Sequence, residues 1–246
     1  MDREIGRLFM EMTKFQNMKP SGQMKGGTPP PLQEGYDASS PLIDLSPPEG
    51  IKVKALNLRD AIEMRRSARS YLPRSMTLEE LSFLLWCTQG VKEFVPDSYV
   101  LRTVPSAGAR HAFETYLLIN NVTGLERGLY RFLAIENKLI RMGVDSEVSR
   151  KVRSACLDQD NVTGAAVVFI WVAVVRRMNW RYGQRGYRYL HLDAGHVCEN
   201  LYLASQAVDS GVCAIGAFLD DDMNSILGLD GKREFVIYIA TVGKVR

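Results

Sequence analysis

Three arginines and two serines crowd the eight residues from Met64 to Tyr71, at the end of a short predicted helix. Arginine presents a fixed fork of donors that matches the oxygens of a phosphate or a carboxylate, and neighbouring hydroxyl groups add further hydrogen bonds. The cluster is therefore a candidate anion site, although an arginine run at a helix end is more often a solvated face. A second basic element, 243–246, follows an apolar strand, and its Lys244 is a candidate to supplement the anion site.

Two segments of small residues offer the backbone itself as a binding surface. The stretch 105–108, Pro-Ser-Ala-Gly, precedes a predicted strand, and the stretch 214–218 ends another. Small side chains allow the backbone to approach a ring or a phosphate closely. The plainer alternatives are a simple loop before a strand for the first segment and a strand bulge at Gly216 for the second.

In their order and spacing, the stretches 65–69, 105–108 and 214–218 resemble the nitroreductase-like FMN flavoproteins. The stretch 181–196 is most similar to the branch of that family that includes the azoline dehydrogenases of peptide natural-product pathways. The similarity runs from about Asn57 to the C-terminus. It implies an α+β, three-layer fold with a mainly antiparallel, mixed sheet covered by helices, and an FMN site at the interface of a homodimer.

The resemblance assigns a part of the cofactor to the basic cluster. Arg65 and Ser67 correspond to contacts with the phosphate and the ribityl chain, and Arg69 corresponds to the region of N1 and the C2 carbonyl. An arginine at that position also makes physical sense, because it stays charged at every working pH and would stabilise the anionic reduced flavin.

The other motifs correspond to ring contacts. Family members contribute the 105–108 loop across the dimer interface. The stretch 215–217 corresponds to a segment over the isoalloxazine, with amides facing N5 and O4. Gln159 corresponds to a contact with the pyrimidine edge, and a lone glutamine is otherwise a surface residue. The candidate cofactor-binding residues are Arg65, Arg66, Ser67, Arg69, Pro105, Ser106, Ala107, Gly108, Gln159, Ile215, Gly216, Ala217 and Lys244.

Three further residues lie close to these motifs. Tyr182 and Arg185 are candidates for the substrate side of the flavin. Arg110 departs from the family pattern, and is either an extra phosphate ligand or a surface charge. The arginines and aromatics of 180–189 would also suit stacking on nucleic acid, but an amphipathic helix start at a subunit interface is the more usual cause. A net charge of +3 is also too slight for a nucleic-acid partner.

The function implied by the resemblance is that of an FMN-dependent oxidoreductase. Hydride would pass through flavin N5 between a reduced donor, NAD(P)H, and a small organic acceptor, or a small substrate would be dehydrogenated. Because the flavin carries the chemistry, no catalytic side chain is assigned. The alternative is a non-catalytic flavin-binding sensor or storage protein. The substrate, the reaction direction and the choice between NADH and NADPH stay open.

Composition narrows the class of protein. Hydrophobic residues make up 46% and charged residues 24% of the 246 residues, as in ordinary globular proteins. The four cysteines have no metal-ligand spacing, which predicts free thiols in a reducing cytoplasm. His191 and His196 are five positions apart and so do not share a helical face as paired metal ligands do. No secretory signal or membrane-spanning apolar run is visible, so no membrane partner is expected.

Proline and glycine divide the chain into two parts. Seven of the ten prolines fall within residues 1–50, together with five glycines from Gly22 to Gly50, which predicts an extended arm or a disordered tail. Residues 51–246 form the predicted FMN-binding domain. Periodicity and capping signals predict helices over 57–65, 77–89, 146–157, 185–210 and 220–227, and strands over 113–120, 128–135, 138–142, 165–175, 212–218 and 234–242.

Overall fold

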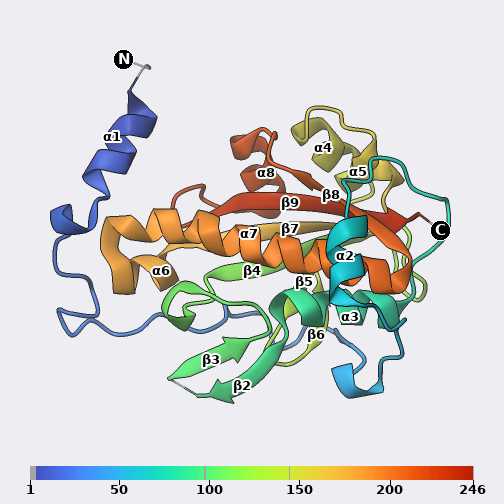
Figure 1. The fold of residues 1–246 in the computed structure, drawn as a ribbon, viewed down its shortest axis with the longest axis horizontal. Coiled ribbons are helices and arrows are strands. Elements are labelled where there is room, and N and C mark those ends of the chain that lie inside the picture. Colours follow the sequence, from blue (N-terminus) through green and yellow to red (C-terminus); the bar gives the residue numbers. More distant parts are fainter. Residues whose placement is uncertain (1–3, 97, 144, 246) are drawn as a thin grey trace.

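The computed structural model describes residues 4–96, 98–143 and 145–245. Its centre is a seven-stranded sheet with the strand order β1-β6-β5-β4-β7-β9-β8 (Figure 1). Every pairing of the described strands is antiparallel, and parallel contacts occur only as isolated bridges at Ser67 and Met76. The strands are β1 (Leu42–Asp44), β4 (Phe113–Ile119), β5 (Gly128–Leu133), β6 (Lys138–Arg141), β7 (Val167–Val174), β8 (Ser210–Ile215) and β9 (Glu234–Lys244).

Helices cover both faces of this sheet. They are α2 (Leu58–Met64), α3 (Leu78–Gln89), α4 (Val148–Ala155), α5 (Asn161–Gly164), α6 (Val175–Tyr182), α7 (Gly186–Ser205) and α8 (Asp220–Leu227). All eight residues of β7 are buried, and its side chains alternate between two cores. Phe169 and Trp171 pack in the core that includes α3 and α7. Ile170 packs in the core that includes α4 and α8. The expected three-layer α+β fold is confirmed.

Most predicted elements are found within a few residues of their expected bounds. The Thr77–Glu80 capping box forms in both directions, at 3.1 and 2.8 Å, and starts α3 as expected. Several elements were not anticipated. Among them, helix α6 follows directly from β7, and a hairpin of β2 (Val91–Val95) and β3 (Tyr99–Arg102) forms a separate two-stranded sheet.

The described part of the first 50 residues is not uniformly extended. It contains a helix, α1 (Ile5–Met12), which projects from the body in Figure 1, and the edge strand β1. Glu34 lies in the stretch between α1 and β1. It shares the guanidinium of Arg177 with Glu114 of β4, with N–O distances of 3.1 and 2.6 Å. Arg177 is only 2% exposed, so this stretch is tied to the sheet by a buried ion pair.

Two further features concern the described residues as a whole. No helix among them is long and apolar enough to cross a membrane. They also contain no group of three or more histidine, cysteine, aspartate or glutamate side chains that could hold a metal ion.

Candidate active site

The basic cluster leaves α2 as an extended segment that lies beside the sheet edge. The amide of Ala68 donates to the carbonyl of Val212 in β8, at 2.8 Å. Gly211 and Gly243, paired across β8 and β9, make this approach possible. A Cβ on Gly211 would lie 2.6 Å from the Cβ of Ala68, and one on Gly243 would lie 2.6 Å from Cγ of Tyr71. The two glycines therefore form a trough for the segment.

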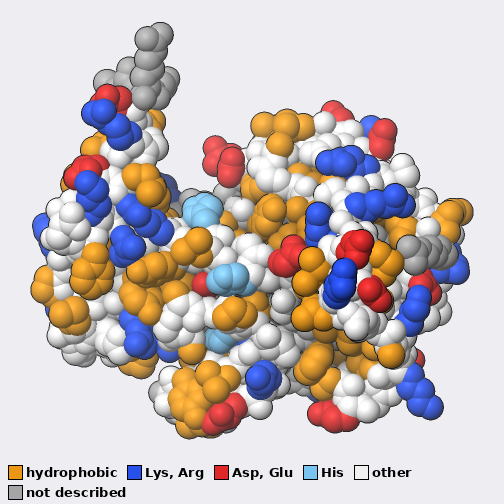
Figure 2. All heavy atoms as spheres, in the orientation of Figure 1, with side chains coloured by type: hydrophobic (Ala, Val, Ile, Leu, Met, Phe, Trp, Pro, Cys, Tyr) orange, Lys and Arg blue, Asp and Glu red, His pale blue; other side chains and the backbone are white. Residues whose placement is uncertain are grey.

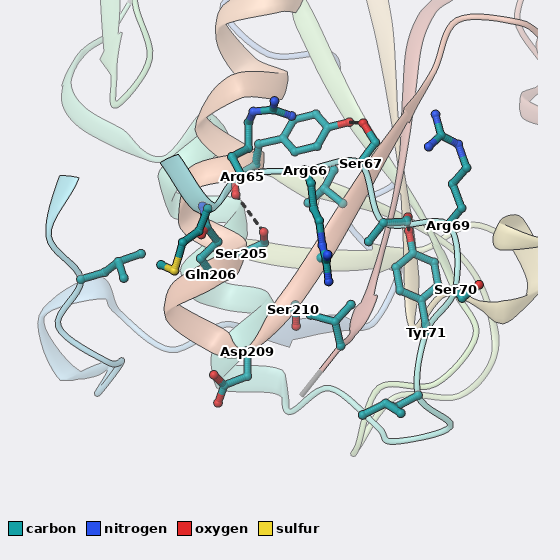
Figure 3. Close-up of a pocket in the computed structure, with 18 of the residues that line it drawn as sticks. Arg65, Arg66, Ser67, Arg69, Ser70, Tyr71, Ser205, Gln206, Asp209 and Ser210 are labelled. Carbon is teal, nitrogen blue, oxygen red and sulfur yellow. Dashed lines mark hydrogen bonds between the residues drawn. The ribbon is translucent and has the colours of Figure 1, made fainter. Parts of the chain in front are cut away.

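An extended backbone alternates its side chains, and this sorts the cluster. In Figure 3, Arg65, Ser67 and Arg69 project to one side of the segment, and Arg66 projects to the other, toward Ser210. The three residues that the sequence assigns to phosphate, ribityl and ring contacts therefore share one side. Arg66 belongs to the same pocket but faces away from them.

A pocket of about 510 Å³ surrounds this segment (Figure 3). It is lined by Lys54, Leu56, Met64, Arg65, Arg66, Ser67, Ala68, Arg69, Ser70, Tyr71, Leu72, Tyr202, Ser205, Gln206, Asp209, Ser210, Gly211, Val212 and Val245. None of the ion pairs among the described residues uses Arg65, Arg66 or Arg69. Their charges are not neutralised within the described chain, so the pocket favours an anionic ligand.

Tyr202 of α7 joins three parts of the site and was not predicted from the sequence. The guanidinium carbon of Arg65 lies 5.3 Å from the centroid of its ring. Its hydroxyl lies 3.0 Å from Ser67 Oγ and accepts a hydrogen bond from the amide of Ala214 at 2.9 Å. The available signal was a tyrosine next to the apolar positions Leu201 and Leu203 near the end of the helix, because a buried tyrosine hydroxyl needs partners.

Arg69 is exposed, and its charge acts on the neighbouring sheet edge. Burial raises the pKa of the Cys213 thiol, and the positive charge of Arg69 opposes that rise. Burial likewise raises the pKa of Tyr71, whose hydroxyl bonds to the side chain of Thr241 at 2.8 Å. Arg69 therefore brings positive potential to the part of the site that leads to residues 215–217.

Gln159 and the 215–217 segment, which are far apart in sequence, lie together. Gln159 Nε2 donates to the carbonyl of Ala217 at 3.3 Å and to that of Cys156 at 3.0 Å. The two residues before it, Leu157 and Asp158, have φ of 57° and 56°, a left-handed conformation that is strained in non-glycine residues. A Cβ on exposed Gly216 would meet nothing within 4 Å. The described chain leaves open space there.

The loop at 105–108 lies apart from this pocket. Ser106 Oγ donates to Oδ2 of Asp193 at 2.6 Å, and the amide of Ala107 donates to Oδ1 at 3.1 Å. Asp193 and Tyr202 are nine residues apart on α7, which corresponds to about 13 Å along the axis and to opposite sides of the helix. Residues 105–108 are absent from the pocket lining among the described residues.

The residues after the loop are strained and electrostatically unusual. Ala109 and His111 have φ of 52° and 41°. Burial lowers the pKa of His111 to about 3, and Arg102, Arg110 and Arg177 add to this effect. His111 is therefore neutral at physiological pH and lies inside a positively charged surrounding.

Lys244 and Arg110 also have partners in the structure. Lys244 Nζ is 2.5 Å from Glu80 Oε1 and 2.7 Å from the carbonyl of Val208, so a phosphate contact would require it to exchange these bonds. Arg246 lies outside the described residues. The guanidinium of Arg110 lies over the ring of Trp180, with 5.2 Å between guanidinium carbon and centroid.

Tyr182 and Arg185 sit on opposite sides of the α6–α7 turn. A Cβ on Gly108 would be 2.4 Å from the hydroxyl of Tyr182, so Tyr182 packs directly on the loop. Arg185 donates to the hydroxyl of Tyr189 and to the carbonyl of Thr13, both at 2.8 Å. Tyr182 therefore stays close to a predicted flavin contact, whereas Arg185 anchors the N-terminal arm.

The donor set fits FMN on observations of the structure itself. Arginines without acidic partners and the hydroxyl of Ser67 suit a phosphate. The open space over Gly216 suits the close approach of a flat ring, since neither its backbone φ nor its packing requires glycine.

Comparison with known proteins agrees with this reading. The family model described as the nitroreductase family matches residues 62–244. A protein of Methanocaldococcus jannaschii, "Putative nitroreductase MJ1384", is 34% identical over 192 residues, which cover 78% of this chain and 93% of that protein. The trifolitoxin-processing protein TfxB of Rhizobium leguminosarum bv. trifolii is 25% identical over 167 residues, which cover 65% of this chain and 45% of TfxB.

A solved structure of a "putative nitroreductase" from Anabaena variabilis has a TM-score of 0.68 and is 28% identical to this chain. The match covers 87% of this chain and 45% of that one. The chain thus spans about half the length of TfxB and of the Anabaena protein. The family match, which covers most of the chain, confirms the family that the sequence resembles. The chain belongs to the nitroreductase family and is an FMN-dependent oxidoreductase.

Proposed function

We propose that the pocket at 64–72 holds the phosphate and ribityl chain of FMN, and that the segment at 215–217 lies against its ring. Arg65 and Ser67 would bind the phosphate end, and Arg69 would lie beside N1 and the C2 carbonyl. Gln159 would contact the pyrimidine edge. When bound, FMN supplies hydride chemistry at N5, and the protein contributes binding, orientation and charge.

The observation that supports this proposal best is the unpaired arginine cluster. Other arginines of the chain, such as Arg177 and Arg153, form ion pairs with carboxylates. Arg65 and Arg69 instead share one side of an extended segment with a serine hydroxyl (Figure 3). Such a set is expected where an anion belongs.

We further propose that the chain works as a homodimer with two shared sites. The 105–108 loop and the arginine pocket lie at separate places along α7, so the loop of one subunit would complete the pocket of its partner. Helix α7 leaves a stripe of exposed residues, with Leu192 60% exposed and nothing within 4 Å of a Cβ on Gly195. In Figure 2, apolar and histidine side chains lie across the middle of this face.

Helix α1 would extend the same interface. Its apolar residues Ile5, Leu8 and Met12 lie on one helical face and are 65%, 59% and 59% exposed. Arg185 and Arg188 fix the end of α1 to the start of α7 through Thr13. The exposed faces of the two helices therefore belong to neighbouring surfaces, which one partner subunit would cover.

The reductant that we propose is NAD(P)H, with a small organic molecule as acceptor; dehydrogenation of a small substrate is the alternative direction. TfxB is named as a toxin-processing protein, which favours inclusion of peptides among the substrates to be tested. All four cysteines are free, as is usual for proteins in a reducing compartment, and this supports a cytoplasmic location.

Spectroscopy of the purified protein tests the proposal. We expect a yellow protein that releases one FMN per subunit on denaturation. Under anaerobic conditions, NADH or NADPH should bleach the flavin absorption, and a quinone or a nitroaromatic should restore it in one turnover. In the alternative direction, an azoline peptide should itself bleach the oxidised flavin as its ring is dehydrogenated. A protein that binds FMN but is reduced neither by nicotinamides nor by an azoline peptide, and that no acceptor reoxidises, would be a sensor or storage protein instead.

Sedimentation at micromolar concentration tests the shared site. We expect a dimer that carries two flavins. A variant with Leu192→Glu should shift toward monomer and lose FMN in parallel, because each pocket would lack the partner's loop. A monomer that retains FMN would contradict the shared site but not the pocket.

A further inference from the structure

We infer that Tyr202 is a positioning residue that sets the direction of the Ser67 hydroxyl proton, so that Ser67 donates to the phosphate of the ligand. The inference rests on the proposed FMN site and adds to it a residue and a proton arrangement. Tyr202 is 9% exposed, and its hydroxyl lies between Ser67 and the backbone of β8.

The proton arrangement follows from the one donor that cannot be reversed. The amide of Ala214 can only donate, so the oxygen of Tyr202 accepts from it, at 2.9 Å. The phenol then has one hydrogen of its own, and Ser67 Oγ at 3.0 Å is its partner among the described residues. If Ser67 donated instead, the phenol hydrogen would be left without a partner in a nearly buried place, which is unfavourable.

Ser67 therefore accepts from Tyr202 and keeps its own hydrogen for another group. Arg65 and Arg69 project to the same side of the segment as Ser67 (Figure 3). An acceptor that meets both the Ser67 hydroxyl and the guanidinium of Arg65 is an anionic oxygen, and a hydroxyl that already accepts a hydrogen bond is a stronger donor. The geometry thus directs amide, phenol and serine hydroxyl in series toward a phosphate.

The substitution Tyr202→Phe distinguishes the contribution of the hydroxyl from that of the aromatic ring. Phenylalanine keeps a ring beneath the guanidinium of Arg65, which lies 5.3 Å from the centroid, and removes only the hydroxyl. Tyr187→Phe is the matched control, because it lies on the same helix and no hydrogen bond of the described residues uses its hydroxyl.

The test titrates flavin-free protein with FMN and with riboflavin, which lacks the phosphate, and follows the quenching of flavin fluorescence. We expect Tyr202→Phe to weaken FMN binding about tenfold and riboflavin binding less than twofold, and Tyr187→Phe to change neither. Ser67→Ala should reproduce the selective loss. The double variant should be no more than about twofold weaker than Ser67→Ala alone, because both substitutions remove the same contact.

The possible results separate the inference from the proposal on which it rests. A wild-type protein that binds neither flavin would overturn the proposed FMN site. Equal FMN affinity in wild type and Tyr202→Phe would overturn only the role of Tyr202. Equal losses for FMN and riboflavin would overturn the phosphate contact. If Tyr202→Phe does not fold, as judged by its urea midpoint, Ser67→Ala alone decides between a phosphate-selective loss, which supports the inference, and none, which overturns it.

Discussion

Two serines, Ser67 and Ser106, are bonded to side chains of the same helix, and are left in opposite states. Their partners on α7, Tyr202 and Asp193, are nine positions apart. Ser106 accepts from the amide of His111 at 2.9 Å and donates to Asp193 at 2.6 Å, so its hydroxyl is fully used. Ser67 is bonded to Tyr202, and it shares its side of the segment with Arg65 and Arg69, which have no acidic partners among the described residues (Figure 3). The middle of α7 therefore holds a loop whose polar groups are satisfied, and its C-terminal end holds an incomplete anion site.

The charged groups near the two serines differ in the same way: those near Ser106 are bonded within the protein, and those near Ser67 form no ion pair within the described chain. Asp193 is a carboxylate inside the protein, and burial raises its pKa while the bonds from Ser106 and Ala107 oppose the rise. At the C-terminal end of α7, the described residues give Arg65, Arg66 and Arg69 no salt bridge. A loop such as 105–108 can therefore be fixed by bonds within the protein alone. A ligand pocket is recognised by hydrogen-bond donors, such as those of Arg65 and Arg69, that have no acidic partner within the described chain.

The largest effect is expected when Arg65 and Ser67, the proposed phosphate contacts, are both removed. Arg65→Ala with Ser67→Ala removes two hydrogen bonds to a charged group, each worth about 1.5–3 kcal/mol, so FMN affinity should fall at least a hundredfold. Fluorescence titration of flavin-free protein measures the loss. Arg59→Ala, an exposed change on α2 outside the pocket, is the control. Unchanged affinity in the double variant would contradict the phosphate assignment.

At the 105–108 loop, Asp193→Ala should lower the stability of the fold more than it lowers FMN affinity. It leaves the half-buried donors of Ser106 and Ala107 without an acceptor, at a cost of up to about 1–3 kcal/mol each in the free energy of unfolding. The melting temperature should fall by about 2–4 °C for each kcal/mol. Asp193→Asn keeps one oxygen as acceptor and should lose less. Equal melting temperatures of all three proteins would show that the loop does not depend on Asp193.

Acid should lower the free energy of unfolding through His111, which follows the 105–108 loop. Its pKa is lowered in the folded state, to about 3 from 6.5, so the unfolded chain binds a proton that the folded protein does not. The stabilisation is present above pH 6.5 and is lost as the pH falls toward 3, at up to about 1.4 kcal/mol per pH unit. Urea midpoints measured from pH 4 to 8 should show this slope.

The variant His111→Asn isolates this effect. Asparagine tolerates the positive φ of 41° at this position and does not titrate in this range. Its stability should depend less on pH than that of the wild type. A wild-type slope that persists unchanged in His111→Asn would assign the acid sensitivity to other groups.

The smallest expected effect belongs to Arg69. In its proposed place, its charge faces negative charge that appears only on reduction, so Arg69→Ala should lower the two-electron potential and leave FMN bound. An exposed charge contributes about 1 kcal/mol, which corresponds to roughly 20 mV. Spectroelectrochemical titration measures the shift, with Arg66→Ala as the control on the opposite side of the segment. If the variant loses FMN while the potential of the bound flavin is unaltered, Arg69 contacts the phosphate and not the ring.

The sequence by itself determined most of the fold, because its signals are local. The apolar, β-branched run around β7 can only be a strand covered on both faces, and the Thr77–Glu80 pair caps α3 through bonds three residues apart. The hairpin at 91–102 and helix α6 carried no such pattern. The arginine-serine cluster was also visible in sequence, since five polar residues lie within eight positions.

Only the tertiary structure decided which groups meet and which are already used. Gln159 reaches the 215–217 segment across 58 residues, and Tyr202 reaches Ser67 across 135. Lys244 and Arg185 resemble free cations in sequence but are engaged by Glu80 and by the arm at Thr13. A residue type states which bonds a side chain can form, whereas the packing of distant segments states which of those bonds remain for a ligand.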